Sequence, residues 1–479
     1  MNILYCTSEA YPFIKTGGLA DVSGSLPLEL KTMGEDVRVI LPLYGQISNE
    51  YRDKMQYIGY YYVDIGLRHE YCGIFKLIHE EVTFYFLDNE FYFKREKIYG
   101  EEDDAQRFLF FSKAVTLFPK VIGFKPDVVH SNDWHTAMVN VFIRDFERGD
   151  EYYKSIKTIF TIHNLKYQGV FRADVLGFAG LSPEYFNEEA LKYYDCVNFM
   201  KGGIVFCDIL TTVSNTYSQE IQHGFYGEGL DGIIRKHSYK LYGIVNGLDY
   251  KTWNPKTDPF LKKNFDKDSL DEKSLNKLEI QKRYNLPQNK EVPMFVMVSR
   301  LVDMKGLDIL IHIMDELLYF EDIQVIVLGT GNSKYENSLK YFQDKYQNKF
   351  AARIYYSNDE SHMLYAGADF LLMPSLAEPC GISQLMAMRY ATLPIVRETG
   401  GLKDTVKPFN KFTMEGTGFS FANINAHELL FTIKKAIEIY QEKEVMKKLR
   451  LSAMSQKNDW EQSAKKYLKL YKRAIGVYE

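Results

Sequence analysis

The chain of 479 residues has few of the residues that cross-link secreted proteins or bind zinc. Its cysteines are scattered and odd in number, and no two of them form a C-x-x-C pair. They are Cys6, Cys72, Cys196, Cys207 and Cys380. This usage excludes a disulfide framework and a cysteine-based zinc site, and it is typical of a reducing compartment. We therefore expect a cytoplasmic protein.

Long apolar runs and an excess of one charge are also absent. No hydrophobic stretch approaches the roughly 20 residues that span a bilayer, and the first residues lack the basic segment of a secretory signal. The net charge is −4, so no global basic field favours nucleic acid or an anionic membrane, and we expect neither as a partner. Any anion must be bound by a local cluster of positive side chains.

The composition that remains is that of a globular protein, with 46% hydrophobic and 25% charged residues. Aromatic residues make up 15%, as 36 Tyr and 32 Phe against 3 Trp. Aromatic rings stack on sugars, but they also fill cores, so composition alone indicates little about a ligand.

Short β-branched runs alternate with helical patterns along both halves of the chain, which predicts parallel βαβ architecture. Strands are expected at 2–8, 36–41, 83–87, 127–130, 158–162, 209–213, 242–245, 294–299, 324–328, 353–356, 370–374 and 393–396. We expect an α/β protein with two Rossmann-like, doubly wound domains that face a deep cleft.

The domain boundaries follow from composition. Residues 1–250 form the first predicted domain, and residues 291–458 form the second. The stretch 251–290 is polar, rich in Lys and Asp and poor in strand formers, so it is predicted to be a linker. Residues 459–479 contain an amphipathic helix, with apolar residues on one face. Those residues are Trp460, Ala464, Tyr467 and Tyr471.

Ligands of open α/β sheets bind beyond the carboxyl ends of the strands, so the residues after each strand are the informative ones. The motif KTGG follows the first strand, with Asp21 close behind. Gly17 and Gly18 let the backbone approach a ligand, and Lys15 supplies a charge for phosphate. An ordinary βα turn with a solvated lysine fits the same pattern. The motif is neither G-x-G-x-x-G nor a P-loop.

Histidines and a carboxylate follow the fourth and fifth strands. The motif HSNDWH contains His130, Asp133 and His135, and the motif TIHN contains His163. Such groups could build a metal site or acid–base machinery. However, His130 and His135 lack the i, i+4 spacing of a zinc-binding helix. Alternatively, these histidines have only a structural role, and Asp133 caps the helix that follows it.

In the second half, Arg300 and Lys305 flank a strand-to-helix loop that suits a diphosphate. Glu378 precedes Pro-x-Gly at another such turn, and a diglycine at 400–401 follows about twenty residues later. Together they favour a sugar-phosphate site. Solvated basic residues and a capping carboxylate would give the same pattern. A D-x-D motif at 266–268 lies in the polar linker and not after a strand, so we expect it to be solvated and to bind no metal.

Together these motifs resemble the bacterial glycogen synthases and plant starch synthases, which are retaining glycosyltransferases of family 5 with the GT-B fold. The resemblance runs essentially end to end. It is carried by KTGGLADV at 15–22, HSNDWH at 130–135, TIHNLKYQG at 161–169, NGLDYKTWNP at 246–255, SRL at 299–301, KG at 305–306, EPCG at 378–381, the segment 397–404 and DW at 459–460. Mild departures occur at 131–132, 376–377 and 382–383.

The resemblance implies roles for the residues at these positions. Lys15, with the backbone of Gly17 and Gly18, is expected to meet the donor from the first domain. Arg300 and Lys305 are expected to clamp the diphosphate, while Glu378 binds the transferring glucose. His163 is expected beneath the sugar, where its backbone carbonyl faces the anomeric carbon. Further expected contacts are Gly381, Ile382 and Ser383 to phosphate, Asp133 and Asp21 to the acceptor or sugar hydroxyls, Tyr356 to adenine, and Asn246 and Gln384 as secondary candidates.

The function implied by the resemblance is glycogen synthase activity. Glucose would pass from ADP-glucose to the non-reducing end of an α-1,4-glucan such as glycogen, with release of ADP and without a metal or other cofactor. Because no pair of carboxylates of the glycosidase kind is evident, we favour return of the acceptor on the same face over a covalent glycosyl-enzyme. The C-terminal helix is expected to pack on the first domain, and closure of the two domains is expected to assemble the site.

Two alternatives remain at this point. One is a related GT-B glycosyltransferase that uses UDP-glucose, because base contacts leave no readable motif. The other is a scaffold that binds glucan without catalysis, although the motif residues are intact.

Overall fold

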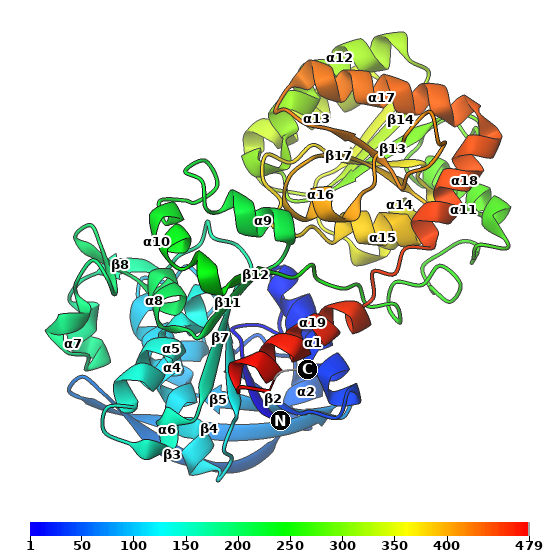
Figure 1. Cartoon of the computed structure of the whole chain (residues 1–479). Coiled ribbons are helices and arrows are strands. Elements are labelled where there is room, and N and C mark those ends of the chain that lie inside the picture. The colour runs from blue at the N-terminus through cyan, green and yellow to red at the C-terminus, as the bar shows by residue number, and fades with distance from the viewer. Residues whose placement is uncertain (478–479) are drawn as a thin grey trace. The chain divides into compact units, whose positions relative to one another are not determined.

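The computed structural model describes residues 1–477 and divides into two compact units. Unit 1 comprises Met1–Gly247 together with the segment that begins at Trp460, and unit 2 comprises Leu248–Asp459. Figure 1 shows that each unit is an α/β sandwich with helices on both sides of a sheet. None of the described helices is long and apolar enough to cross a membrane.

Unit 1 is built on a mixed nine-stranded sheet. Its strand order is β12 (Leu241–Gly243), β11 (Ile209–Thr212), β7 (Lys157–Ile162), β6 (Val128–Asn132), β1 (Asn2–Cys6), β2 (Asp36–Pro42), β5 (Val82–Asp88), β4 (Arg68–His79), β3 (Gln56–Ile65). The strands from β12 to β5 are parallel, whereas β4 and β3 form an antiparallel hairpin at the edge. A small antiparallel sheet, β8 (Val170–Arg172), β10 (Cys196–Asn198) and β9 (Lys192–Tyr193), lies apart from it.

The helices of unit 1 cover the parallel part of the sheet on both faces (Figure 1). They are α1 (Gly18–Thr32), α2 (Asn49–Arg52), α3 (Glu90–Phe93), α4 (Asp104–Val121), α5 (Asp133–Phe146), α6 (Glu151–Lys154), α7 (Val175–Ala179), α8 (Phe199–Phe206), α9 (Asn215–Glu220), α10 (Asp231–Lys236) and α19 (Trp460–Ala474), with 3₁₀ turns η1 (Pro183–Tyr185) and η2 (Ser238–Lys240).

Unit 2 contains a six-stranded sheet that is parallel throughout. The order is β15 (Phe350–Arg353), β14 (Gln324–Leu328), β13 (Met294–Val298), β16 (Phe370–Met373), β17 (Leu393–Arg397), β18 (Phe419–Phe421). Its helices are α11 (Lys273–Arg283), α12 (Leu307–Phe320), α13 (Ser333–Lys345), α14 (Asn358–Gly367), α15 (Ser383–Arg389), α16 (Gly400–Thr405), α17 (Ala426–Gln441) and α18 (Lys443–Met454), with 3₁₀ turns η3 (Leu270–Glu272) and η4 (Asp303–Lys305).

Most parallel strands lie where the sequence predicts them, because strands buried on both faces read as continuous apolar runs. One predicted strand was misplaced, and one hairpin was missed. The strand expected at 353–356 is β15 and ends at Arg353, so Tyr356 lies in the following loop and not at a strand end. The hairpin of β3 and β4 was not predicted, because one of its faces is exposed and its sequence is rich in tyrosine.

The stretch 251–290, predicted to be a linker, belongs to unit 2. Phe265, Leu270 and Ile280 are buried in the core of that unit. The polar composition suggested a solvent-exposed linker, but lysines of this segment are buried inside unit 2. The ammonium of Lys273 is buried and donates hydrogen bonds to the carbonyl oxygens of Ala366 and Tyr390, at 2.8 Å each, and to two further oxygens.

The last helix, α19, packs against α1 in unit 1. The four residues predicted to form its apolar face, Trp460, Ala464, Tyr467 and Tyr471, are all buried. The Tyr471 hydroxyl shares a hydrogen bond of 2.7 Å with His130 Nδ1 at the core of the parallel sheet. The predicted amphipathic face is therefore confirmed.

Unit 2 holds a buried ionic cluster around Asp369. Its carboxylate accepts hydrogen bonds from Lys277 Nζ at 2.6 Å, Arg450 Nη2 at 2.5 Å and the Met294 amide at 2.8 Å. Burial opposes ionisation of Asp369, but the two cations more than offset it and hold the pKa below its usual value. The cluster ties α11 and α18 to the amino ends of β13 and β16.

We expect Asp369→Ala to destabilise the protein by about 3–5 kcal/mol, because it leaves the buried Lys277 and the partly buried Arg450 without their partner. Urea unfolding at pH 7 measures this, with Asp322→Ala as a control that removes an exposed carboxylate of the same unit. The control should stay within about 0.5 kcal/mol of the parent. Equal stability of the two variants would contradict the structural role of the cluster.

Candidate functional site

In unit 1 the loop that follows β1 is held by a residue that the sequence analysis missed. Glu9 is buried, and its Oε2 accepts hydrogen bonds from the Thr16 amide at 2.5 Å, the Thr16 hydroxyl at 3.0 Å and the Gly17 amide at 3.3 Å. Burial raises the pKa of Glu9, while the bonds from Thr16 and Gly17 lower it and the charge of Asp21 raises it. A glutamate directly after a strand and before a diglycine was the available signal.

The rest of this loop places Lys15 and the start of α1. Lys15 Nζ donates to Asp21 Oδ1 at 2.7 Å, and both side chains are partly exposed. Gly17 is the N-cap of α1 in an extended conformation without a side-chain cap, and Gly18 is the first helical residue. Lys15 thus lies near the amino end of a helix of 15 residues, in an exposed ion pair, and its contact with a donor stays a prediction.

Asp133 connects two further loops of unit 1. It has a positive φ of 54° at the start of α5, and no side-chain bond caps that helix. Instead Oδ1 accepts the His163 amide at 2.7 Å and the Asn164 amide at 3.4 Å, in the loop after β7. The alternative that Asp133 caps its own helix is therefore wrong. Its carboxylate fixes the backbone around His163.

The three candidate histidines lie in different environments. The His163 ring shares a hydrogen bond of 2.9 Å with Asn132 Oδ1, and burial lowers its pKa to about 3. His130 is fully buried between Tyr471 and Thr161, which is a structural position. His135 is buried beside Tyr99, with ring centroids 4.2 Å apart, and its Nδ1 has no hydrogen-bond partner within residues 1–477. Among the described residues no group of three His, Cys, Asp or Glu side chains could hold a metal.

Unit 2 brings Lys305 and Glu378 together. Lys305 ends the turn η4 after β13, and Glu378 lies in the loop after β16. Lys305 Nζ donates to Glu378 Oε2 at 2.5 Å, and the Ser375 hydroxyl donates to the same oxygen at 3.0 Å. Arg300 lies in the same loop as Lys305, and its side chain is exposed. The predicted diphosphate loop and the predicted carboxylate thus share one edge of the sheet.

Glycines explain how these loops meet. A Cβ on Gly306, which follows Lys305 and has a φ of 73°, would stand 1.9 Å from the Pro374 carbonyl oxygen. A Cβ on Gly400 would stand 2.0 Å from the Glu378 carbonyl oxygen. The diglycine that the sequence analysis linked to phosphate therefore packs on the backbone of the Glu378 loop. Its first role is to allow this close approach.

A second missed residue, Arg397, supports the same loop from β17. Its guanidinium is buried and donates to the carbonyl oxygens of Ser375 at 2.7 Å and Leu376 at 2.5 Å. These contacts hold the two residues that lead into Glu378. No local pattern distinguishes such an arginine from an exposed one, because its partners are backbone atoms distant in sequence.

The remaining candidates of unit 2 lie at the start of α15 and in the loop after β15. Gly381 has a φ of 71°, and Ile382 and Ser383 begin α15. Tyr356 is 69% exposed. Tyr356 lies in the loop between β15 and α14, and its proposed contact with adenine stays a prediction.

Two amide side chains were secondary candidates. Gln384 donates to the carbonyl oxygens of Cys380 and Gly381, so it stabilises the turn after Glu378. In unit 1, Asn246 is buried, and its Oδ1 has no hydrogen-bond partner among the described residues. A buried acceptor without a partner is costly, which is consistent with a ligand donor in the functional state.

Comparison with known proteins identifies the class. Residues 2–236 match the model of the starch synthase catalytic domain, and residues 279–450 match that of glycosyl transferases group 1. The catalytic domain of starch synthase IV from Arabidopsis thaliana, solved with ADP and acarbose, superimposes with a TM-score of 0.91 at 31% identity, over 99% of both chains. Sucrose-phosphate synthase from Thermosynechococcus elongatus shares the fold alone, with a TM-score of 0.64 at 15% identity over both whole chains. The chain is a glycosyltransferase of the GT-B fold.

Relatives define the family more narrowly. The glycogen synthase of Finegoldia magna is 57% identical over 475 residues, which cover 99% of this chain and 100% of the relative. That of Clostridium acetobutylicum is 51% identical over 474 residues, 98% and 99% of the two chains. The chain belongs to the glycogen synthase family, and the resemblance stated from the sequence is confirmed.

The role of Glu9 in holding the loop after β1 can be tested by amide hydrogen exchange. Glu9→Ala should speed amide hydrogen exchange at Thr16 and Gly17 by tenfold or more, because hydrogen bonds worth about 1 kcal/mol each are lost. Glu9→Gln, which keeps an acceptor oxygen, should lie near the parent.

Asp208 supplies the matched control. Its carboxylate likewise accepts the amide and hydroxyl of one threonine, Thr158, elsewhere in unit 1. Asp208→Ala should speed exchange at Thr158 and leave Thr16 and Gly17 unchanged. Equal acceleration in both segments by either variant would show general destabilisation and contradict the local role of Glu9.

Asp133 should make stability depend on pH. Burial raises its pKa to about 7, the His163 and Asn164 amides lower it, and the Glu9 charge raises it. Because the folded pKa exceeds the unfolded value of about 3.9, its contribution is fully present below about pH 4 and is lost as pH rises through about 7. Asp133→Asn cannot ionise, so its stability relative to the parent should be roughly 1–3 kcal/mol greater at pH 8 than at pH 5. A difference that is the same at both pH values in thermal unfolding would refute this.

Proposed function

We propose that this chain is a retaining glucosyltransferase that lengthens α-1,4-glucan chains with glucose from ADP-glucose and releases ADP. One observation carries the proposal. In a chain related over its full length to glycogen synthases, Lys305 and Glu378 are paired at the carboxyl edge of a parallel sheet, in the same loop system as Arg300. Cytoplasmic action is part of the proposal, since all five cysteines are free.

The donor is proposed to be an adenine nucleotide sugar. The starch synthase IV structure with ADP and acarbose supports this choice. On unit 2, Arg300 and Lys305 bind the diphosphate, and the backbone of Gly381, Ile382 and Ser383 contributes amide donors. Tyr356, which is exposed in the loop after β15, stacks on the base.

Charge explains why these groups accelerate transfer. When the glycosidic bond of the donor breaks, positive charge develops on the sugar and negative charge grows on the leaving diphosphate. Arg300 and Lys305 stabilise the growing negative charge, and Lys15 of unit 1 adds a third cation beside the amino end of α1. Release of Lys305 from Glu378 and of Lys15 from Asp21 would make both ammonium groups available to phosphate.

The sugar is proposed to be bound by the polar groups around it. Glu378 accepts hydrogen bonds from glucose hydroxyls, and the free oxygen of Asn246 accepts another. The His163 backbone carbonyl faces the anomeric carbon. Asp133 acts through His163, because its carboxylate already binds the amides of His163 and Asn164. Asp133 is thus a positioning residue, while Asp21 serves the acceptor side.

The reaction is proposed to proceed on one face of the sugar. The bond from the anomeric carbon to the diphosphate oxygen breaks as the acceptor 4-hydroxyl forms a bond to the same carbon from the same side. The hydroxyl proton passes to the diphosphate oxygen that leaves, so ADP departs and the anomeric configuration is retained. A glucosyl adduct trapped on any side chain would overturn this mechanism.

The test is glucose incorporation into a glycogen primer, with ADP-glucose and UDP-glucose offered separately. Lys305→Ala should lower kcat by about 10²–10³, because one group that stabilises the leaving diphosphate is lost. Lys334→Ala is the matched control, since Lys334 forms an exposed ion pair with Asp308 in the same unit. This control should retain at least half of the parent activity.

The other outcomes separate the alternatives. Preference for UDP-glucose would keep the chemistry and change the donor. Absence of transfer from either donor, with glycogen still bound, would identify a glucan-binding scaffold. Equal loss in Lys305→Ala and Lys334→Ala would contradict the assignment of the site.

A further inference from the structure

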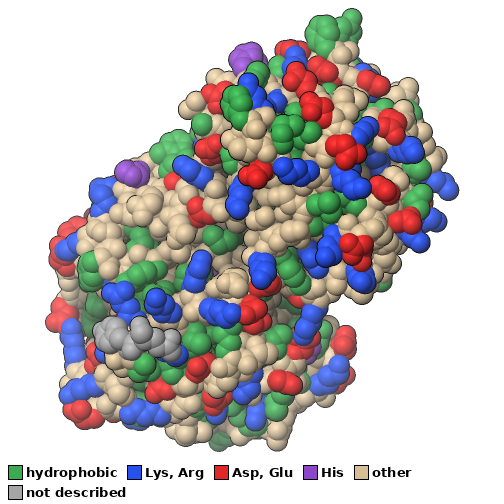
Figure 2. Space-filling view, turned by 45° about the vertical axis from the view of Figure 1, so that its right-hand side comes forward, with side chains coloured by type: hydrophobic (Ala, Val, Ile, Leu, Met, Phe, Trp, Pro, Cys, Tyr) green, Lys and Arg blue, Asp and Glu red, His purple; other side chains and the backbone are tan. Residues whose placement is uncertain are grey.

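Unit 2 contains a glutamate that is buried although it lies next to an exposed loop. Glu360, in the first turn of α14, has only 6% of its side chain exposed. Figure 2 shows acidic and basic side chains interspersed over the face in view, and ion pairs between such exposed groups contribute little to stability. A buried carboxylate is costly unless it is bonded, so the partners of Glu360 indicate what it does.

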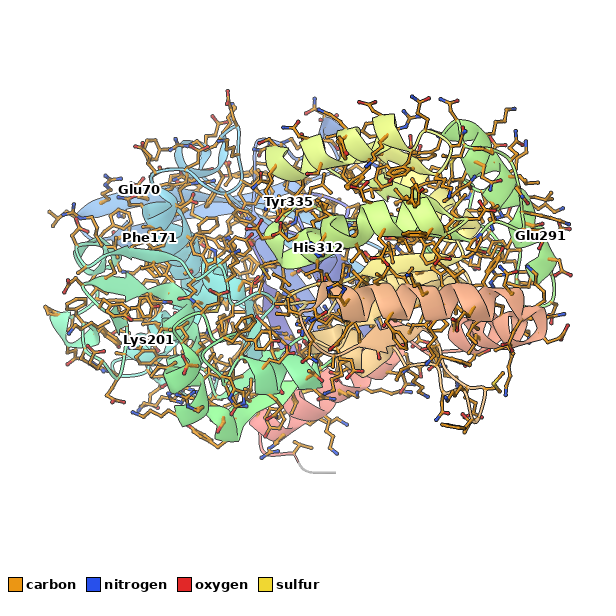
Figure 3. The ribbon with its side chains drawn as sticks, turned by 90° about the horizontal axis from the view of Figure 1, so that it is seen from above. Glu70, Phe171, Lys201, Glu291, His312 and Tyr335 are labelled. Atoms are coloured by element: carbon orange, nitrogen blue, oxygen red, sulfur yellow. The ribbon has the colours of Figure 1, made fainter. Side chains whose placement is uncertain are left out.

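Both oxygens of this carboxylate accept hydrogen bonds. Oε1 accepts from Arg283 Nη2 at 3.2 Å and from the Tyr355 hydroxyl at 2.7 Å, and Oε2 accepts from the Tyr284 hydroxyl at 2.6 Å. Arg283 and Tyr284 lie at the end of α11, which packs against α14. In Figure 3 the labelled Glu291 marks the segment that leads from α11 to β13. Tyr355 is different, because it comes from the loop after β15.

The carboxylate of Glu360 is held in its charged form. Burial raises its pKa, but the hydrogen bonds from Tyr284, Tyr355 and Arg283 more than offset this, and the pKa lies below its usual value. Glu360 is therefore ionised at neutral pH and is an acceptor for all three donors. Hydrogen bonds to a charged acceptor are stronger than those between neutral groups.

Glu360 holds the short loop 354–357, between β15 and α14, at two points. Its amide donates at 3.3 Å to the hydroxyl of Ser357, the residue that caps α14. Ser-x-x-Glu is the sequence of a capping box, in which the glutamate side chain returns to the amide of the capping serine. Here the carboxylate binds the Tyr355 hydroxyl and the end of α11 instead. One residue thus contacts both Tyr355 and Ser357.

Tyr356 lies between these two anchored residues. Its ring is 69% exposed, whereas that of Tyr355 is 43% exposed. The start of the loop is also tied to α11, because Arg353 Nη2 donates to the Arg283 carbonyl oxygen at 3.2 Å. The backbone on either side of Tyr356 is therefore constrained while its ring remains open to a ligand. A ring presented in this way loses less conformational entropy when a planar base stacks on it.

We propose that Glu360 is a positioning residue for the nucleotide donor: through the Tyr355 hydroxyl it fixes the loop that presents Tyr356 to the adenine. This inference rests on the proposed function, in which Tyr356 stacks on the base. Glu360 and Tyr355 contact no reacting atom in this role. They raise the affinity for the adenine nucleotide and do not contribute to the chemical step.

The alternative is that the cluster only joins α11 to α14. Glu360 would then stabilise the fold through Arg283 and Tyr284, and the Tyr355 hydroxyl would have no effect on the donor. The variant Tyr355→Phe separates the two roles, because it removes one oxygen atom from a partly exposed ring and leaves the bonds from Arg283 and Tyr284 in place.

The experiment uses the full chain with ADP as the probe. Tyr355→Phe should raise the Kd for ADP, measured by isothermal titration calorimetry, by about three- to tenfold, because the loop must then be ordered on binding. The KM for ADP-glucose should rise in parallel. The kcat should stay within about twofold of the parent, as expected when only ground-state binding changes.

A double-mutant cycle tests whether Tyr355 acts through Tyr356. Tyr356→Ala alone should raise the Kd for ADP by about tenfold or more, because stacking on the base is lost. Adding Tyr355→Phe to Tyr356→Ala should raise the Kd no further, because the ring that the hydroxyl positions is gone. Glu360→Ala should raise the Kd at least as much as Tyr355→Phe. If Glu360→Ala fails to fold, Tyr355→Phe carries the test.

Tyr346→Phe is the matched control. The Tyr346 hydroxyl also donates to a carboxylate of unit 2, Asp315 Oδ1 at 2.9 Å, but Tyr346 lies at the end of α13 and not in the loop. This variant should leave the Kd for ADP and the KM for ADP-glucose unchanged.

Several results would overturn the proposal. Unchanged ADP binding in Tyr355→Phe would do so, as would an equal loss in Tyr346→Phe or additive effects of the Tyr355 and Tyr356 changes. A fall in kcat with an unchanged KM would also contradict it. Calorimetry needs no turnover, so a parent that transfers no glucose but binds ADP in a Tyr355-dependent way would refute the proposed function and leave the positioning role standing. A parent that does not bind ADP would overturn both.

Discussion

Contact between backbones without intervening side chains is the constraint on which the unit 2 site depends. Three loops must touch for Lys305 to reach Glu378, and each contact occurs at a glycine. Gly306 lies against Pro374, Gly400 against Glu378, and Gly401 against Cys380, where a Cβ would stand 1.9 Å from the carbonyl oxygen. Any other residue at these positions would separate the loops by the width of a methyl group. The ion pair is a result of this packing.

In unit 1, carboxylate side chains hold the loops of the candidate site in place. Glu9 accepts amide groups of its own loop, Asp133 accepts amide groups of the loop after β7, and each satisfies at least two backbone donors. Buried carboxylates are costly unless they are bonded in this way. The charge of Glu9 also raises the pKa of Asp133, so the ionisation of Asp133 depends on the loop after β1 as well as on the amides of His163 and Asn164.

The sequence predicted the parts of the site that carry a local signature. Lys15, Lys305 and Glu378 follow strands close to glycine or proline, Arg300 follows β13 almost directly, and parallel topology brings such residues to one edge of each sheet. Residues that act on distant backbone atoms could not be found. Arg397 binds carbonyl oxygens of another loop, whose positions only the folded chain defines, so no spacing in the sequence reveals it. Glu9 had an available signal, its place between a strand and a diglycine, which the sequence analysis did not use.

Errors in the predicted fold have a common physical origin. The segment 251–290 was read as a linker because its lysines suggested solvent, yet Lys273 and Lys277 are buried with full sets of acceptors. The β3–β4 hairpin was overlooked because tyrosines on an exposed face weaken the apolar signal of a strand. Composition indicates the environment that each residue type has on average. In these two segments lysines are buried and tyrosines are exposed, so the average does not apply.

The position of α19 has a consequence for how the protein is made. Unit 1 takes its last helix from residues that follow all of unit 2, and Tyr471 completes the environment of His130 in the middle of the sheet. During synthesis the first 247 residues therefore emerge with an apolar strip uncovered, and unit 2 is translated in full before that strip can be closed. A chain that ends before the final helix leaves the apolar surface of α1 and the ring of His130 without the side chains that cover them in the complete fold.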